Sequence, residues 1–344
     1  SASKHIPVTR AMIKAIHKGT IKQILSTKHF NFSKEQYETD VLFVGGSTNL
    51  NYNGTYFSGD LSGITTGTQP RWFQNFSLPG PEIRSQSSWE NKLQDIVDNA
   101  KSWNVGFICG VPAWIQILFE RIIKHYGVNT IHDVWPNLSA FVHGGVSAQP
   151  YKNSINALCG KPILYLDTYM ASEGFIAYQE RPNEQQSMRL ITDNKMFFEF
   201  IPFNEENFDS DGNIKPNANP LNITEVELEK DYALLITNCA GAWRYLIGDT
   251  IKFTDLARCE IIVTGRTKHF LSLCGEHLSV DNMNSAIKLT ASDLNININE
   301  YCVVGVPYDG LFAHHWYVGT DVQTDESRKK QKLDGYLKQV NDDY

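Results

Sequence analysis

Four short stretches of this 344-residue chain combine residue types that could handle a phosphorylated ligand. The first is Ser1-Ala2-Ser3-Lys4, which offers hydroxyls, backbone N–H groups and an ammonium directly ahead of an expected helix. Such a combination can hold triphosphate oxygens. Serine-rich chain ends that hold no ligand are common, so this stretch alone does not separate the two interpretations.

The second stretch is YMASEGF (169–175), which directly follows an apolar segment expected to form a strand. Ligands bind at the carboxyl ends of parallel strands, where Tyr169 could stack on a base and Glu173 could hold Mg²⁺ between phosphate oxygens. The alternative is the N-terminus of a helix, capped by Ser172 and with Glu173 complementing the helix dipole. The spacing alone favours this alternative.

The third stretch is WRYLIGDT (243–250), and the fourth is GRTKHFLSLCGEHL (265–278). Asp249 could accept hydrogen bonds from the two hydroxyls of a ribose, whereas a Gly-Asp turn is the ordinary interpretation. Arg266 could pair with phosphate or ribose oxygens through its planar guanidinium, and Gly265 could permit a hinge. The alternative for the fourth stretch is a polar linker.

The elements that must position these stretches alternate between helices and strands over the first two-thirds of the chain. Thr9 is expected to cap a helix that ends near Ser26. One face of this helix is expected to carry Ile13, Ile16, Thr20 and Ile24. Further helices are expected at 87–103 and 111–127, and buried strands at 41–46, 105–110, 138–145 and 162–169. Because helices separate these strands, the sheet is expected to be mainly parallel.

Two other patterns follow along the chain. Short alternating segments after about residue 190 predict an antiparallel sheet or partial barrel. From Gly265 on, a helix at 282–293, two strand-like segments and a charged helix from about residue 324 predict a small α+β unit. The expected fold class is α/β, a mainly parallel sheet with helices plus an antiparallel, barrel-like subdomain and a small α+β C-terminal domain. The expected domain ranges are 1–190, 191–265 and 266–344.

The composition excludes several classes of protein. The net charge of −7 argues against an electrostatic nucleic-acid binder, which needs clustered Lys and Arg. No apolar run approaches the ~18 residues that a membrane helix needs, so no membrane partner is expected. The six cysteines are scattered without metal-ligand spacing, which indicates buried reduced thiols. We therefore expect a cytoplasmic enzyme.

The order of the four stretches resembles that of the adenylate-forming superfamily, and more closely that of the auxin-responsive acyl-acid–amido synthetase family in its bacterial branch. The matching stretches are SKHIPVT, GDLSGI (59–64), GVPAW (110–114), VWPNLSAFVHGGVS (134–147), YMASEGF, WRYLIGDTIKFT (243–254) and GRTKHFL…GE (265–276). They extend over essentially the whole chain, so an adenylate-forming-enzyme-like fold is expected.

The resemblance implies a ligase that uses ATP and Mg²⁺. A carboxylic acid would attack the α-phosphate of ATP to give an acyl-adenylate and pyrophosphate, and the amine of an amino acid would then displace AMP to form an amide. Two alternatives stay open: an acyl-CoA ligase that shares the first step, and a catalytically inactive relative that binds a nucleotide. The implied partners are small-molecule acid and amino acid substrates, and a monomer is expected.

The resemblance also implies roles for individual residues that hold the base and the phosphates. Ser3 and Lys4 would close the phosphate loop. Tyr169 would stack on adenine, and Ser172 would lie near the phosphates. Part of the adenine pocket would be formed by His143, Gly144, Gly145, Val146 and Ser147.

Further implied roles concern the metal, the ribose and the joint between domains. Glu173 would hold Mg²⁺, and Asp249 would bind the ribose hydroxyls. Arg266 would mark the joint about which the small domain swings between the two half-reactions, with Lys268 near the pivot. The side chains expected to act in catalysis are Lys4, Ser172 and Lys268.

The resemblance further implies a fragment truncated at both ends. Family members carry S-S-G-T-T-S before the Ser3-Lys4 pair, a helical segment ahead of that loop and a longer C-terminal domain, so the fragment itself could be inactive. Tyr56, Phe57 and Trp114 are candidate walls of the acyl pocket, and ordinary core packing is the alternative for such aromatic residues.

Overall fold

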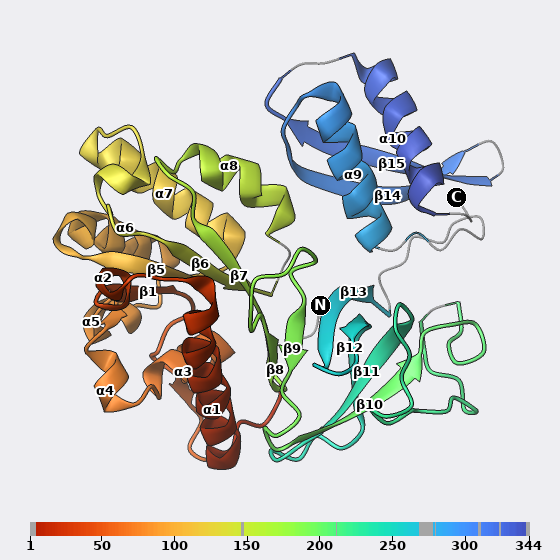
Figure 1. Cartoon of the computed structure of the whole chain (residues 1–344), viewed down its shortest axis with the longest axis horizontal. Coiled ribbons are helices and arrows are strands. Elements are labelled where there is room, and N and C mark those ends of the chain that lie inside the picture. The colour runs from red at the N-terminus through yellow and green to blue at the C-terminus, as the bar shows by residue number, and fades with distance from the viewer. Residues whose placement is uncertain are drawn as a thin grey trace. The chain divides into compact units, whose positions relative to one another are not determined.

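The computed structural model describes residues 5–145, 148–210, 212–267, 278, 280–308, 311–322 and 325–341. The chain divides into two compact units (Figure 1). The first unit comprises Ser1–Met196 and Asn238–Ala242, and the second comprises Phe197–Thr237 and Trp243–Tyr344.

The first unit is built on a sheet whose strands lie in the order β9-β8-β7-β6-β5-β1-β4. The parallel strands are β1 (Asp40–Val44), β4 (Ser77–Leu78), β5 (Val105–Gly110), β6 (Ala140–Gly144) and β7 (Leu164–Ala171). The antiparallel strands β8 (Gly174–Tyr178) and β9 (Met188–Leu190) extend it beyond β7. The mainly parallel sheet expected from the sequence is therefore confirmed.

Helices cover both faces of this sheet. They include α1 (Arg10–Ser26), α6 (Trp89–Asn99), α7 (Pro112–Tyr126) and α8 (Lys152–Ala157). Helices α6, α7 and α8 bury Ile96, Phe119 and Ile155 in one core cluster together with Phe141 of β6 and Tyr165 of β7. The opposite face is covered in part by the 3₁₀ turn η1 (Thr27–Phe30), through Phe30 against Ala140 and Leu166.

Several short elements complete the first unit. They are the helices α2 (Lys34–Tyr37), α3 (Leu61–Gly67), α4 (Arg71–Gln74) and α5 (Pro81–Arg84), the 3₁₀ turns η2 (Ala100–Ser102), η3 (Ile131–Asp133) and η4 (Gln149–Tyr151), and the hairpin of β2 (Asn51–Tyr52) and β3 (Phe57–Ser58).

Local sequence signals set the ends of the long helices. Thr9 Oγ1 accepts a hydrogen bond from the Met12 backbone N–H at 3.2 Å, which caps α1. Pro112 occupies the first turn of α7, and Gly127 ends that helix with φ of 62°. These features confirm the helix ends predicted from the sequence.

The expected apolar face of α1 is wrong in part. Its buried residues are Met12, Ala15, Ile16, Gly19 and Ser26, whereas Ile24 is 37% exposed. The reason is a close approach to β8: a Cβ at Gly19 would lie 2.7 Å from the Phe175 ring. The helix therefore packs through its glycine-bearing face, which the apolar periodicity alone does not reveal.

The second unit begins with antiparallel strands in the order β10-β11-β12-β13. These are β10 (Met196–Pro202), β11 (Asp231–Asn238), β12 (Tyr245–Asp255) and β13 (Glu260–Arg266). Phe200, Tyr232 and Phe253 are buried and pack edge to face, with the centroids of Phe200 and Phe253 5.1 Å apart. This aromatic cluster stabilises the sheet that carries Asp249, the residue predicted to bind ribose.

The same unit contains the small α+β part at the end of the chain. Strands β14 (Ile298–Tyr308) and β15 (Leu311–Thr320) form an antiparallel hairpin, and helices α9 (Val280–Leu294) and α10 (Glu326–Val340) pack together with it. The predicted fold class, an α/β chain with an added antiparallel sheet and a small α+β C-terminal part, is confirmed.

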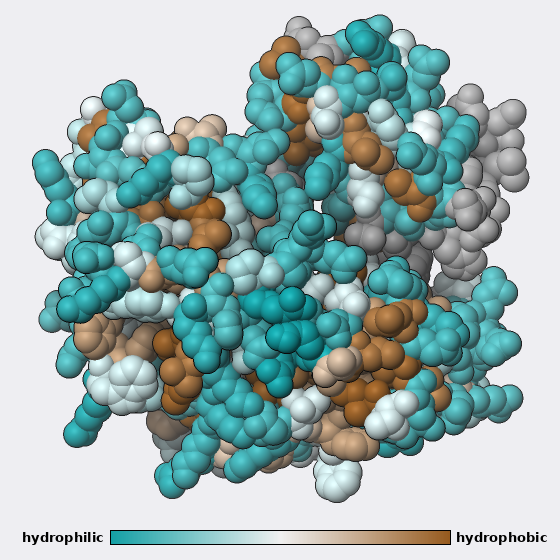
Figure 2. Space-filling view, viewed as in Figure 1, coloured by the Kyte–Doolittle hydropathy of each residue, from teal (hydrophilic) through white to brown (hydrophobic). Residues whose placement is uncertain are grey.

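Two expectations from composition can be compared with the described residues. The five cysteines at described positions are free thiols, as the sequence predicted, but the expectation that they are buried is wrong, because four are half-buried and Cys302 is exposed. No described helix combines the length and the apolarity needed to cross a bilayer. Figure 2 shows that hydrophilic side chains cover much of the visible face, with smaller hydrophobic patches between them.

Candidate nucleotide site

The predicted nucleotide residues of the first unit that the structure describes lie at the carboxyl ends of β6 and β7. These strands are parallel neighbours in which His143 is paired with Asp167, and Gly144 with Thr168. Tyr169 comes one residue after Thr168 on β7. The structure therefore brings the end of the HGG segment beside the start of the YMASEGF segment, although the two are more than twenty positions apart in sequence.

The glycines after His143 are required by the backbone. A Cβ at Gly144 would lie 2.4 Å from the Thr168 carbonyl oxygen, so no larger residue fits without displacing β7. Gly145 has φ of 81°, a conformation that other residues adopt only with strain. A turn of this kind lets a ligand approach the main chain closely.

Ser172 and Glu173 form the two-residue turn of the β7–β8 hairpin, in which Ala171 is paired with Gly174. The alternative interpretation of this stretch as a helix N-terminus is therefore wrong. Gly174 has φ of 147° at the end of the turn. Local sequence did not distinguish a helix start from a hairpin, because the antiparallel pairing with β7 decides it.

The side chains at this turn differ in their exposure. Glu173 is 1% exposed, and its carbonyl oxygen accepts a hydrogen bond from Asn238 Nδ2 at 2.8 Å. Tyr169 is 8% exposed, and Ser172 is half-buried. Burying a charged carboxylate costs free energy unless a hydrogen-bond donor or a cation compensates its charge.

Glu173 also fits the donor set that Mg²⁺ requires. Magnesium is usually bound by one or two carboxylates, with phosphate oxygens and water completing the octahedron. Among the described residues, no cluster of three or more His, Cys, Asp or Glu side chains could hold a metal alone. A site at Glu173 would thus be completed by the phosphates of the nucleotide.

A buried histidine, His143, is paired with a half-buried aspartate, Asp167, on the same two strands. His143 is 3% exposed, and its Nδ1 lies 3.4 Å from Asp167 Oδ1. Burial, with a smaller contribution from the charge of Lys152, lowers the pKa of His143 to about 4. Burial raises the pKa of Asp167 to about 7, and Lys152 opposes that shift. The imidazole is therefore neutral at pH 7, whereas the carboxyl changes its protonation near neutrality.

Two aromatic rings lie near His143, and a lysine lies over one of them. The His143 ring lies 5.3 Å from Phe141 and 6.1 Å from Tyr165, centroid to centroid. Lys152 Nζ lies 5.0 Å from the Tyr165 ring centroid. Sequence reasoning missed Asp167 and Lys152. A single acidic residue inside the apolar segment PILYLDTY was the signal that could have identified Asp167.

Asp249, which is predicted to bind the ribose, and Arg266, which is predicted to mark the joint, contact each other in the second unit. Asp249 on β12 is paired with Arg266 on β13, and Arg266 Nε lies 3.1 Å from Asp249 Oδ1. Arg266 also donates to the Ile247 carbonyl oxygen at 3.3 Å. Gly248 and Asp249 lie within β12, so their interpretation as an ordinary turn is wrong.

The remaining candidates divide into two groups. Ser3, Lys4, Val146, Ser147 and Lys268 lie outside the described residues. Of the candidate acyl-pocket walls, Trp114 packs on Trp89 with ring centroids 4.7 Å apart, whereas Tyr56 and Phe57 are exposed.

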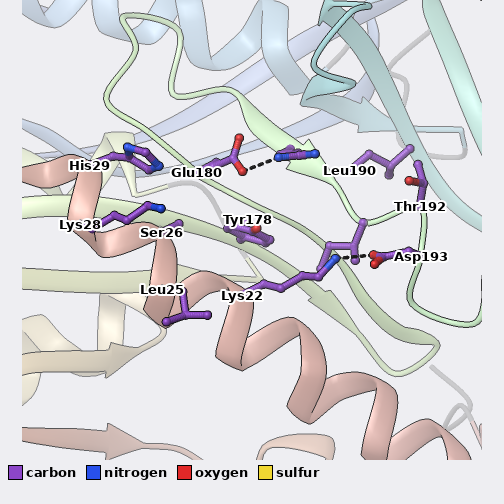
Figure 3. A pocket seen from close by; sticks show the side chains of 12 residues that line it. Lys22, Leu25, Ser26, Lys28, His29, Tyr178, Glu180, Leu190, Thr192 and Asp193 are labelled. Atoms are coloured by element: carbon purple, nitrogen blue, oxygen red, sulfur yellow. Dashed lines mark hydrogen bonds and ion pairs between the residues drawn. The ribbon is translucent and has the colours of Figure 1, made fainter.

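A separate cavity of about 320 Å³ lies where the end of α1 and η1 meets β8 and β9 (Figure 3). Its lining includes Lys22, Lys28, His29, Tyr178, Glu180 and Asp193. None of the residues predicted to bind the nucleotide lines it.

Parts of this chain are similar in sequence to known proteins. Residues 189–260 match the GH3 family central domain. The chain is 34% identical over 185 residues to jasmonoyl–L-amino acid synthetase GH3.5 of Oryza sativa subsp. japonica, an alignment that covers 48% of this chain and 31% of that protein. It is 29% identical over 173 residues to indole-3-acetic acid-amido synthetase GH3.2 of Arabidopsis thaliana, covering 48% and 29%. The match thus spans about a third of the length of these relatives.

Solved structures share the fold. AtGH3.15 acyl acid amido synthetase in complex with 2,4-DB superimposes with a TM-score of 0.75 at 14% identity, covering 99% of this chain and 69% of that one. The postadenylation state of 2-hydroxyisobutyryl-CoA ligase gives a TM-score of 0.61 at 14% identity, covering 97% and 65%. The predicted adenylate-forming-enzyme-like fold is confirmed, as is the resemblance to acyl-acid–amido synthetases.

Proposed function

We propose that this chain carries an ATP-dependent acyl-acid–amido synthetase activity. The observation that carries the proposal is the sequence similarity to proteins named as amido synthetases, together with the GH3 central-domain match at 189–260. The convergence of the HGG and YMASEGF segments at one end of a parallel sheet supports a nucleotide at that place.

The chemistry consists of two displacements. In the first, an oxygen of the substrate carboxylate forms a bond to the α-phosphorus of ATP, and the bond to pyrophosphate breaks. In the second, the nitrogen of an amino acid forms a bond to the acyl carbon, AMP leaves with the bonding electrons, and the amine loses a proton. AMP is a better leaving group than the oxide ion that a free carboxylate would have to expel. The first step therefore makes an unreactive carboxylate reactive.

The first unit would bind the base and the phosphates. Tyr169 would contact adenine, and the glycine turn at 144–145 would let the base approach the backbone. Ser172 would lie near the phosphates, and Glu173 would hold Mg²⁺. When bound, the ion would neutralise charge on the phosphate oxygens. Ser3 and Lys4 would close the phosphate loop.

The second unit would bind the ribose. Asp249 would accept hydrogen bonds from the sugar hydroxyls, with its carboxylate oriented by Arg266 at 3.1 Å. We further propose a large domain formed by 1–190 and 191–265 and a lid formed by 266–344. Arg266 and Lys268 would mark the joint on which the lid moves, and Lys4, Ser172 and Lys268 would assist the chemistry.

Several narrower proposals rest on the sequence resemblance alone. They are membership of the bacterial branch of the family and action as a monomer, whereas the proposed cytoplasmic location rests on the composition. The acyl acid is not named by these proposals. Since two relatives carry jasmonoyl and indole-3-acetic acid in their names, both acids belong in any substrate panel.

Pyrophosphate exchange across a panel of carboxylic acids tests the first step. The expected result is exchange that depends on one class of acid and that is abolished in Glu173→Ala and in Asp249→Ala. Unchanged exchange in both variants would contradict the proposal. No exchange combined with nucleotide binding would favour the non-catalytic alternative.

The second step separates the amido synthetase from an acyl-CoA ligase. The 2-hydroxyisobutyryl-CoA ligase shares the fold, so the acceptor must be measured. Incubation with the preferred acid, ATP and either amino acids or coenzyme A, followed by mass spectrometry, is expected to yield an amide. A thioester as the sole product would establish the ligase alternative.

A further inference from the structure

The cavity between the end of α1 and the strands β8 and β9 has a floor of buried residues and a charged rim. Tyr178, Leu190 and Ile191 are buried and form its base. Its volume of about 320 Å³ lies at the lower end of the range for small-molecule sites, ~300–1,000 Å³. The cavity therefore suits a compact ligand with a short apolar portion.

Both acidic side chains of the rim already have cationic partners. Asp193 accepts hydrogen bonds from Lys22 and Lys18, which hold its pKa at about 2. Glu180 forms an ion pair with Arg189. In Figure 3, dashed lines mark the pairs at Glu180 and at Asp193. The negative charge of the rim is thus compensated from within the cavity.

Two further basic residues of the rim differ from these pairs. Lys28 and His29 line the cavity and form no ion pair with any described residue. They lie at the left of the view in Figure 3, whereas Thr192 and Asp193 lie at the right. The lining contains three lysine or arginine side chains but only two carboxylates, so the rim carries an excess of positive charge before His29 is counted.

Capping of α1 does not account for Lys28 and His29. Basic residues just after a helix often satisfy its last carbonyls. Here Ser26 Oγ donates to the Gln23 carbonyl oxygen at 2.6 Å, and Thr27 Oγ1 donates to that of Ile24 at 2.5 Å. The hydroxyls already perform that task, so the basic side chains stay available to a ligand.

We propose that this cavity binds a small organic oxyanion with two or more negative charges, carried by phosphate or carboxylate groups. Lys28 provides the principal charged contact, His29 provides a ring N–H donor, and Tyr178 forms the floor beneath the body of the ligand. Burial raises the pKa of Tyr178, so its hydroxyl stays protonated and can donate. The site is separate from the predicted nucleotide residues and does not depend on the proposed ligase activity.

Isothermal titration of the whole chain with citrate and, separately, with inorganic phosphate tests this proposal at low ionic strength. The Lys28→Ala/His29→Ala double variant is expected to lose about tenfold or more in affinity, the loss expected for removing charge-assisted hydrogen bonds. Lys34→Ala is the matched control, because the Lys34 side chain is 84% exposed and lies outside the cavity. The control is expected to bind like the unchanged protein.

The two probes distinguish the kinds of anion. Binding of citrate alone identifies a polycarboxylate site, and binding of phosphate alone identifies a phosphate-ester site. Binding of neither probe, or equal losses in the double variant and in Lys34→Ala, overturns the proposal. Thermal unfolding of both variants excludes misfolding as the cause of a loss.

Discussion

Arg266 Nε lies 3.1 Å from Asp249 Oδ1 across the ladder that joins β13 to β12. The pairing orients a half-buried carboxylate from a neighbouring strand, so the carboxylate does not depend on a flexible loop for its position. Because the guanidinium is also held by the Ile247 carbonyl oxygen, its direction is set by the backbone.

Removal of this guanidinium is expected to weaken nucleotide binding through Asp249. Arg266→Ala should raise the KM for ATP by about tenfold, which corresponds to the loss of one charge-assisted hydrogen bond. Lys230→Ala, which breaks the exposed Lys230–Glu227 pair in the same unit, serves as the control and should leave the KM unchanged. Equal effects of the two changes would refute a specific role for Arg266.

Glu173 is expected to determine the magnesium requirement. Chelation of divalent cations should abolish pyrophosphate exchange, and Glu173→Gln should raise the Mg²⁺ concentration for half-maximal rate by about tenfold or more, since a neutral amide replaces a buried carboxylate. A titration of rate against Mg²⁺ at saturating ATP measures this. An unchanged magnesium dependence would place the metal elsewhere.

The His143–Asp167 pair predicts two pH dependences of stability that have opposite signs. The pKa of Asp167 rises from its ordinary value of 3.8 to about 7, so stability from this group falls as pH increases between those values. The pKa of His143 falls from 6.5 to about 4, so stability from this group falls as pH decreases over that window. The two contributions oppose each other between about pH 4 and 6.5.

Single substitutions should expose each contribution. Relative to the unchanged protein, Asp167→Asn should make the free energy of unfolding fall more steeply as pH decreases from 6.5 to about 4. His143→Gln should instead make it fall more steeply as pH increases towards about 7. Urea unfolding at a series of pH values measures both slopes. Parallel profiles for all three proteins would show that the pair does not titrate in this way.

Gly144 is expected to tolerate no side chain. In Gly144→Ala, the new Cβ would lie 2.4 Å from the Thr168 carbonyl oxygen, so β6 or β7 must shift at a cost of about 1–3 kcal/mol. Gly80→Ala is the matched control in the same unit, because no atom lies within 4 Å of its Cβ position. Urea unfolding should separate the two variants, and similar stabilities would contradict this account.

The sequence by itself determined the elements whose ends carry local chemical signals. Helix α7 begins at Pro112 and is capped at its end by Gly127, and Thr9 caps the start of α1. The apolar run at 105–110 forms β5. Each signal acts within a few residues of the position it determines. The order of the motifs likewise identified Tyr169, Glu173 and Asp249 as candidates without knowledge of the fold.

The tertiary structure alone decided how these residues are surrounded. The face that α1 buries depends on the Phe175 ring, the turn at Ser172 depends on pairing with β7, and the contact of His143 with Asp167 depends on strand register. Each involves partners distant in sequence, and burial changes the pKa of both members of the pair. Register and burial are properties of the assembled sheet, so local sequence patterns do not predict them.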